Sequence, residues 1–358
     1  MGPNSWMSRA RCPHSVIVFF TRQLATMLRS GMPILDALNG LSHQHEDAVF
    51  TEVVSAIALR ISQGHNFSAS LACFPRIFSP VYVTMVRVGE RTGDLDASLE
   101  KLASWVEKDF ALVRKIRSSL TYPAFVLALT TGATLFLFHS VLPGFVEVLR
   151  QMDAELPMPT RVMFLLTGAV RNPGIWMLAL TGFLATYFLV RDAWRQPRSA
   201  ARLFRAILAV PVVGPLVAMS TTARFCAVVG TLLSSGLDVM TSLRLGAHAS
   251  GNALLAEDST RIVDCIVEGE TLSTGMDEAP GLYPSMLRQL VRVGEESSSV
   301  ADMMLKAAWF YDDEVDYRAE ALGVVIEPLL LGFLALIVGF VIVSVFLPLY
   351  ASLGKLGA

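Results

Sequence analysis

The sequence carries little charge for its length. Only 17% of its 358 residues are charged, whereas 53% are hydrophobic and the mean hydropathy is +0.52. Soluble domains carry about 25% charged residues, so the composition argues against a wholly water-soluble enzyme. The charged residues that do occur gather in two long blocks separated by apolar runs. This pattern predicts a membrane protein with water-exposed domains rather than a bundle with only short loops.

The chain also lacks the motifs of common active sites. It contains no GxxxxGKS/T nucleotide loop, no HExxH and no GxSxG. Its four cysteines, Cys12, Cys73, Cys226 and Cys265, lie far apart and form no CxxC pair, which indicates reduced thiols. A net charge of −2 gives no basic surface for nucleic acid. We therefore predict a protein that is not an enzyme, needs no cofactor or metal, and does not bind nucleic acid.

Three uncharged, apolar runs are long enough to cross a membrane, which takes about 20 residues. They lie within 118–146, 173–190 and 321–350. Residues 206–223 are uncharged too, but the sequence Pro-Val-Val-Gly-Pro interrupts them and arginines flank them. We predict that this fourth stretch is a connector rather than a span.

Basic residues near these runs predict the orientation. Lys108, Arg114, Lys115 and Arg117 precede the first run, and five arginines follow the second. By the positive-inside rule both charged blocks face the cytoplasm, in a multi-pass inner-membrane protein with a cytoplasmic N-terminus. The predicted order is a short N-terminal segment (1–15), a first cytoplasmic helical domain (16–117), a first span (118–146), a periplasmic loop (147–172), a second span (173–190), a cytoplasmic connector (191–223), a second helical domain (224–320), a third span (321–350) and a periplasmic tail (351–358).

The two charged blocks are copies of one another. Residues 20–38 read FTRQLATMLRSGMPILDAL and residues 225–243 read FCAVVGTLLSSGLDVMTSL, so aligning Gly31 with Gly236 sets an offset of 205 (236 − 31). The same offset pairs the two VRVGE sequences, which end at Glu90 and Glu295, and continues without a gap. A register kept over this length indicates an internal duplication. Because equivalent domains should share a compartment, two crossings rather than three should separate them.

Each copy has the pattern of a helical bundle. Apolar residues recur at helical spacing, and no stretch alternates with period two. Gly31 suits the left-handed position after a helix, while Pro33 and its counterpart Asp238 suit the start of the next. Residues 95–117 form a long amphipathic helix that should run into the first span, where Pro123 could kink it. The predicted fold is all-α, with two homologous antiparallel helical bundles and three transmembrane helices.

The repeated Val-Gly-Glu sequence has two interpretations. In the structural one, Gly89 and Gly294 let the chain reverse, and the carboxylates of Glu90 and Glu295 cap the following helix or pair with Arg87 and Arg292. In the functional one, the carboxylates are exposed and bind a partner or a divalent ion. The structural interpretation is favoured, because a lone carboxylate is not a ligand set. Arg87, Glu90, Arg292 and Glu295 remain the candidate partner-contact residues.

Few polar groups lie at membrane depth. His139 is alone within the first span, and Glu327 stands at the cytoplasmic end of the third, directly before Pro328. Ionisable residues in such places are functional candidates by default, although snorkelling or helix packing also accounts for Glu327. We take Glu327, Pro123 and Pro328 as candidate intramembrane functional residues.

Several segments together resemble the type II secretion protein F family. They are FTRQLATMLRSGMPILDAL, the paired Gly-Glu sequences, PVVGPLVAMSTTARFCAVVGTLLSSGLDV, and IEPLLLGFLALIVGF at the last span. The resemblance runs from about residue 16 to the end and includes the duplicated layout. It departs from the family pattern in the short segment before the first helix, which favours a type IVb-like pilus system. It also departs at Ser298-Ser299, where the first copy has Gly93-Asp94.

The resemblance implies an inner-membrane platform protein of a type IV pilus or type II secretion machine. Such a protein would couple a hexameric cytoplasmic assembly ATPase to the insertion of pilin or pseudopilin subunits. It would also contact other inner-membrane platform proteins and form a homo-oligomer. The alternative is a transporter or channel subunit, since parallel repeats also occur in transporters. That alternative would need more spans or polar, broken helices at mid-membrane.

Overall fold

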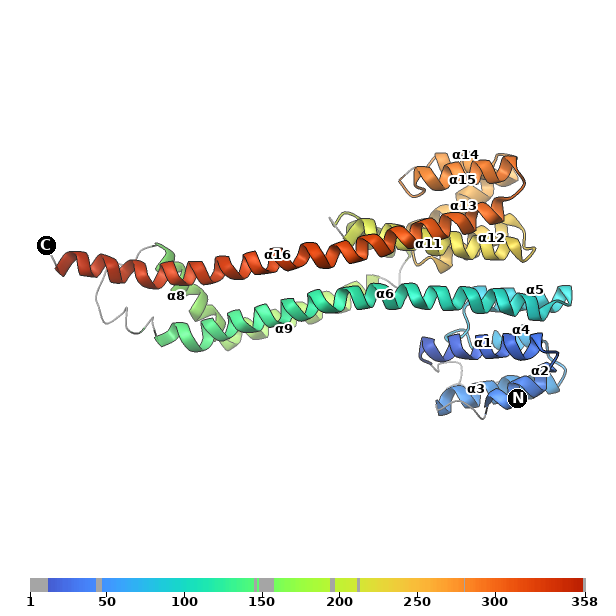
Figure 1. The fold of residues 1–358 in the computed structure, drawn as a ribbon, viewed down its shortest axis with the longest axis horizontal. Helices are drawn as coiled ribbons and strands as arrows, with labels where there is room; N and C mark the ends of the chain where they lie inside the picture. Colours follow the sequence, from blue (N-terminus) through green and yellow to red (C-terminus); the bar gives the residue numbers. More distant parts are fainter. Residues whose placement is uncertain are drawn as a thin grey trace. The chain divides into compact units, whose positions relative to one another are not determined.

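The computed structural model describes residues 12–42, 47–144, 147, 158–193, 197–210, 213–279 and 281–356. Every regular element in these ranges is a helix (Figure 1), which confirms the predicted all-α class. In chain order the elements are α1 (His14–Arg29), α2 (Ile34–Ser42), α3 (Ala48–Ser62), α4 (Phe67–Leu71), α5 (Pro80–Thr92), α6 (Leu95–Phe136), η2 (Leu137–Val141), α8 (Met158–Arg171), α9 (Pro173–Ala193), α10 (Pro197–Leu208), α11 (Val213–Ser234), α12 (Val239–Ala249), α13 (Ala253–Val267), α14 (Leu272–Asp277), α15 (Ser285–Glu296) and α16 (Val300–Leu356).

The chain divides into two compact units. The first contains residues 1–115 and 204–316, and therefore both helical domains. The second contains residues 116–203 and 317–358, where the three predicted spans lie. Both copies of the duplicated domain thus belong to one unit.

Aromatic side chains from α1, α3 and α5 form the centre of the first helical domain. Phe20 lies edge-on to Phe50, with ring centroids 5.2 Å apart, and 6.3 Å from Phe78. Tyr82 is buried against Phe78, and its hydroxyl shares a 3.0 Å hydrogen bond with the hydroxyl of Thr21. Each fully buried aromatic side chain contributes about 1.5–3 kcal/mol. Phe20 therefore lies in the core of the first helical domain, where it is fully buried.

The second helical domain repeats the first helix by helix. The bounds of α3 and α13 differ by the predicted offset at both ends, and α6 and α16 begin at Leu95 and Val300, which have the same offset. In its core, Phe225 lies 6.1 Å from Tyr283, and these residues stand where Phe20 and Phe78 stand in the first domain. The duplication read from the sequence is thus present in the structure.

The predicted glycine position ends the first helix of both domains. Gly31 and Gly236 have φ angles of 85° and 88°, in the left-handed region that only glycine adopts at little cost. The amide of Gly31 donates to the Leu28 carbonyl at 2.9 Å, and the amide of Met32 donates to the Met27 carbonyl at 3.1 Å. This pair of bonds is a Schellman motif, which satisfies carbonyls that the helix end would otherwise leave unpaired.

The second helix of the second domain begins at the predicted cap. Oδ2 of Asp238 accepts a 2.8 Å hydrogen bond from the amide of Thr241. This bond holds the pKa of Asp238 below its usual range. In the first domain Pro33 stands one residue before α2 rather than in its first turn.

The apolar helix α11 is buried by both domains. Its Cys226 and Val229 belong to the core of the second domain, whereas Val228 and Leu232 are fully buried in the core of the first. A helix that is apolar all round belongs in a core or in a membrane. Although Gly214–Ser234 is long and apolar enough to span, 56% of its most apolar window is buried within the protein. This packing supports a core position for α11.

Within the described ranges three helices are long and apolar enough to cross a membrane, which is the predicted number, but one of them is α11 in place of the predicted second span. Two coincide with the predicted first and third spans, at Ala124–Gly144 and Pro328–Leu347, and each has only 17% of its window buried. The third is the α11 segment. The predicted second span lies instead in a bent pair, Met158–Val170 with Pro173–Phe188, whose helices meet at 69°.

The predicted loop at 147–172 contains a helix. Its second half forms α8, whose Met163 is fully buried in a small apolar cluster of the second unit. Nearby, the hydroxyl of Thr160 donates to the carbonyl of Ser344 in α16 at 2.8 Å. Charge counting alone does not separate a loop from a short amphipathic helix, so this element was missed. The described residues of the predicted connector at 191–223 include α10 and the start of α11, and α11 runs without interruption across the boundary expected at 224.

The long helices join the domains to the candidate spans. α6 is one helix of 42 residues, as predicted for the amphipathic segment that begins it, and it remains helical through Pro123. A π-helical turn, η2, follows it and contains His139. α16 is one helix of 57 residues that passes through Glu327 and Pro328.

Candidate functional site

The repeated glutamates cap the short helices that precede them. From α5, Glu90 accepts hydrogen bonds from the amides of Phe67 at 2.5 Å and Ser68 at 3.1 Å, and from the Ser68 hydroxyl. These amides open α4, whose own N-cap residue Asn66 makes no side-chain cap bond. Amides in the first turn of a helix lack carbonyl partners and carry partial positive charge. The Glu90 carboxylate therefore satisfies the start of α4.

The second domain repeats this arrangement. Glu295 accepts from the amides of Leu272 at 2.5 Å and Ser273 at 3.2 Å, at the start of α14. The prediction that the two glutamates cap a helix is therefore right, but the helix predicted to be capped is wrong. Each caps the preceding short helix, 22 or 23 residues earlier in the chain, rather than the following one.

The chain does not reverse at Gly89 or Gly294, contrary to the prediction. Both lie inside helices, where a Cβ on Gly89 would stand 2.7 Å from the Ser98 Cβ and one on Gly294 would stand 2.9 Å from the Val300 Cα. These glycines allow close helix packing instead. The reversal falls later, at Gly93 with φ 75° in the first domain, and at Ser298 with φ 53° in the second.

The two candidate arginines differ in their partners. Arg292 pairs with Asp277 through a 2.6 Å contact, and Arg288 binds the same carboxylate. Arg87 is exposed and makes no hydrogen bond or ion pair within the described ranges. The predicted pairing of each arginine with its neighbouring glutamate is therefore wrong in both domains, because the glutamates are engaged at helix starts.

The candidate membrane residues lie within the long helices. Glu327 and Pro328 are in α16 and Pro123 is in α6. Pro328 is exposed and begins a candidate span. The side chains of Glu327 and Pro123 lie outside the described residues, so a functional role for all three stays a prediction.

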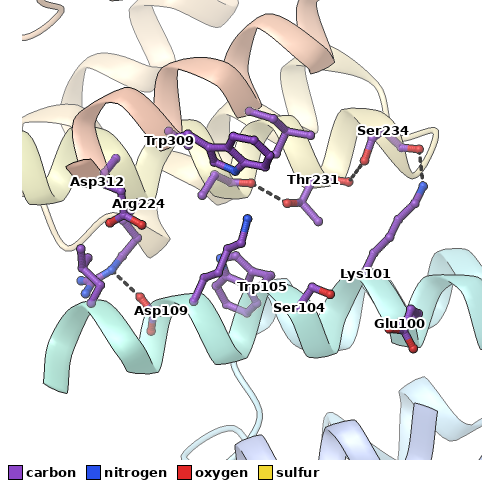
Figure 2. A pocket seen from close by; sticks show the side chains of 16 residues that line it. Glu100, Lys101, Ser104, Trp105, Asp109, Arg224, Thr231, Ser234, Trp309 and Asp312 are labelled. Atoms are coloured by element: carbon purple, nitrogen blue, oxygen red, sulfur yellow. Dashed lines mark hydrogen bonds and ion pairs between the residues drawn. The ribbon is translucent and has the colours of Figure 1, made fainter. Parts of the chain in front are cut away.

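Sequence reasoning missed a groove between the two helical domains. Figure 2 shows α6 on one side of it and α11 and α16 on the other, with Trp105 and Trp309 among its lining residues. Its volume is about 420 Å³. We call this site the inter-domain groove. Its lining residues come from 100–112, 223–234 and 305–312, so only the tertiary fold brings them together.

Polar contacts fasten α6 to the second domain along the inter-domain groove. Nε of Arg224 lies 2.7 Å from Oδ1 of Asp109, and Nζ of Lys101 donates to the carbonyl of Ser234 at 2.6 Å (Figure 2). Nζ of Lys108 stands 4.7 Å from the centre of the Trp309 ring, in cation–π range. Beyond the groove, Lys115 pairs with Asp316 at 2.5 Å. These contacts join the two copies into one unit.

Two equivalent carboxylates, one in α6 and one in α16, have opposite electrostatic environments. Glu107 binds Arg22 through Nε at 2.6 Å, and this guanidinium holds the pKa of Glu107 below its usual range. Asp312 is the counterpart of Glu107, but Ala227 stands at the position of Arg22. Burial, followed by the nearby negative charge of Asp316, raises the pKa of Asp312. The second domain therefore carries an acidic group without the arginine that neutralises its equivalent.

The described residues contain no cluster of three or more His, Cys, Asp or Glu side chains that could hold a metal ion. The divalent-ion interpretation of Glu90 and Glu295 thus gains no further ligands from the fold. The arrangement packs two helical domains into one unit, and each domain continues into a long helix.

Comparison with known proteins gives a consistent result. The family described as type II secretion system (T2SS), protein F, matches twice, at residues 20–143 and 225–348. These two matches have the offset of the internal repeat. The type IV pilus assembly protein PilC of Thermus thermophilus is 35% identical over 340 residues, which cover 95% of this chain and 83% of that protein. Type II secretion system protein F of Xanthomonas campestris is 32% identical over 349 residues, covering 96% and 84%, and that of Vibrio cholerae is 27% identical over 334 residues, covering 93% and 81%.

Proposed function

The chain belongs to the type II secretion system protein F family, and we propose that it is the inner-membrane platform protein of a type IV pilus or type II secretion machine. In this role it couples a cytoplasmic assembly ATPase to the insertion of pilin or pseudopilin subunits into the filament. The names of its relatives support the class of machine. The coupling role goes beyond those names and depends on the architecture.

One observation carries the coupling proposal. Two homologous helical domains form one unit, and each continues without a break into a helix that contains a candidate span. A continuous helix transmits rotation or displacement along its axis, because every residue is tied to its neighbours by backbone hydrogen bonds. A partner that moves the domains would thereby move the membrane segments. Both domains face the cytoplasm in this proposal, where such an ATPase works.

The test is to make α6 flexible between the domain and its span. A Gly/Ser insert of about seven residues between Lys115 and Ile116 breaks the helix, whereas an alanine-rich insert of equal length keeps it and adds about two turns. We expect the flexible variant to accumulate in the membrane but to lose filament assembly, and the helical variant to retain more of it. Filament counts by electron microscopy and immunoblots of the membrane fraction measure both.

Two outcomes would contradict the proposal. Normal filaments with the flexible insert would remove the mechanical coupling. Normal filaments in a strain lacking the protein would remove the platform role altogether.

A further inference from the structure

The two helical domains have the same fold but different charge. Residues 16–117 contain 11 Lys and Arg against 10 Asp and Glu, which gives a net charge of +1. Residues 224–320 contain 7 against 16, which gives −9. The two copies therefore present different surfaces to the surrounding solution, one nearly neutral and one strongly acidic.

A basic pocket lies where α4, α5 and α6 meet in the first domain. Its volume is about 530 Å³, and its charged lining residues are Arg87, Glu90 and Arg91. Glu90 is engaged at the start of α4, so its charge is already matched. Arg87 and Arg91 are exposed, stand four residues apart on one face of α5, and make no hydrogen bond or ion pair within the described ranges. We call this pair the basic face.

The equivalent place in the second domain is acidic. Arg292, the counterpart of Arg87, is neutralised by Asp277, whereas the first domain has Ala72 at the position of Asp277. Glu296 replaces Arg91. The carboxylates of Glu268, Glu270 and Glu296 are exposed and have no ion pair in the described part of the chain. Glu270 lies two residues before Leu272, whose amide Glu295 binds, and Glu296 follows Glu295 in the chain. We call Glu268, Glu270 and Glu296, which flank this cap, the acidic face.

We propose that the basic face of one copy of this chain binds the acidic face of a second copy. Each face offers what the other lacks: two free guanidiniums, which bind carboxylates through paired hydrogen bonds, and three free carboxylates. Among the described residues of one chain, neither Arg87 nor Arg91 forms an ion pair, so the two faces do not satisfy each other there. Two copies can make this contact twice about a two-fold axis, or successive copies can make it head-to-tail and close as a ring.

The two faces occupy equivalent positions in the two copies of the repeat. The basic face lies beside the start of α6 at Leu95, and the acidic face includes the end of α15, just before α16 starts at Val300. Because the two domains are repeats, each face lies at the same place within its own domain. The proposal depends on the proposed function only in placing both domains in one compartment.

An anionic lipid surface is the other source of negative charge for Arg87 and Arg91. α6 runs 21 residues from Leu95 to Lys115, where it leaves the first unit, and this corresponds to about 30 Å of helix. The chain reaches its candidate span only after Lys115. The exposed carboxylates of the acidic face complement Arg87 and Arg91 in charge, which favours a protein partner, and binding to a lipid surface is an outcome of the test below.

The test is charge reversal and restoration in the full-length protein in detergent. We expect Arg87→Glu/Arg91→Glu and Glu270→Arg/Glu296→Arg each to weaken self-association by about tenfold or more, as for loss of a specific charge contact. The variant with all four changes should recover most of the affinity, because the two faces have exchanged sign. Sedimentation equilibrium at low and high salt measures the dissociation constant, and added salt should weaken the wild type but not the two-site variants.

A matched control has the same change of net charge elsewhere. Arg244→Glu/Lys306→Glu alters two other exposed cations and should self-associate like the wild type. Circular dichroism confirms that each variant is helical. Wild-type association of Arg87→Glu/Arg91→Glu, or failure of the four-site variant to recover, would overturn the proposal. The proposal would also be overturned if Arg87→Glu/Arg91→Glu lost binding to phosphatidylglycerol vesicles while its self-association stayed unchanged. Filament assays are not part of this readout, so failure of the platform role would be seen separately.

Discussion

At the scale of single residues, the repeated glutamates have a structural task that their spacing did not reveal. Glu90 and Glu295 each bind two amides at the start of a short helix. The helices α4 and α14 have five and six residues, too few to be stable alone. Because Glu90 lies in α5 and Glu295 lies in α15, these bonds hold α4 against α5 and α14 against α15.

We predict that Glu90→Ala destabilises the first domain by about 1–2 kcal/mol, since it removes a charged cap and leaves buried amides unpaired. Hydrogen exchange of the segment 67–71 should accelerate before that of the rest of the domain. Glu52→Ala is the control, because this exposed carboxylate of α3 in the same domain makes no described contact and should stay within about 0.5 kcal/mol of the wild type. Equal exchange in the Glu90 variant and the wild type would show that α4 does not depend on this carboxylate.

The equivalent carboxylates Glu107 and Asp312 should respond to pH in opposite ways. Arg22 lowers the pKa of Glu107, so its stabilisation is present above the ordinary carboxyl pKa and is lost as pH falls through the lowered value. Burial raises the pKa of Asp312, so its ionised form costs stability near neutral pH, and this cost disappears as pH falls.

Glu107→Gln should therefore lower the melting temperature at pH 7, by an amount equivalent to about 1 kcal/mol or less for this partly exposed pair. Asp312→Asn should leave it unchanged or raise it. Thermal unfolding followed by circular dichroism between pH 4 and pH 8 compares the two, and both differences should shrink toward the acid end. Destabilisation by Asp312→Asn at pH 7 would mean that its charge has a partner after all.

At the scale of helices, the local signals in the sequence were accurate. The apolar period, Gly31 and Asp238 defined helices and their ends because each depends on neighbours within one turn. The helix α8 was missed because its polar residues resembled a loop. The purpose of Gly89 was misread because a glycine that permits reversal and one that permits close packing look alike in a sequence.

At the scale of the whole molecule, α11 decides the topology. If Gly214–Ser234 packs in the cores of both domains and does not cross the membrane, the two domains share a compartment; if it crosses, they lie on opposite sides. The burial of Val228 and Leu232 in the first domain, and of Cys226 and Val229 in the second, supports the first arrangement. Lys101 and Asp109 add polar contacts that hold α6 to the same helix.

We predict that cysteines introduced at Gln63 and Glu268, in a background without native cysteines, are labelled from the same side of the membrane. These two positions are equivalent in the repeat and exposed. An impermeant maleimide should label neither in intact spheroplasts and both after lysis. Labelling of one position before lysis would place the domains in different compartments and make α11 a span.

The sequence by itself determined the all-α class, the duplication and its register, the helix ends and two of the candidate spans. These features depend on composition, periodicity and residues close together in the chain. Only the tertiary structure decided which helix Glu90 caps, why α11 is apolar on every side, and that Arg292 forms an ion pair while Arg87 forms none among the described residues. Each of these depends on surfaces more than ten residues apart in sequence coming into contact, and a linear pattern does not specify which surfaces will meet.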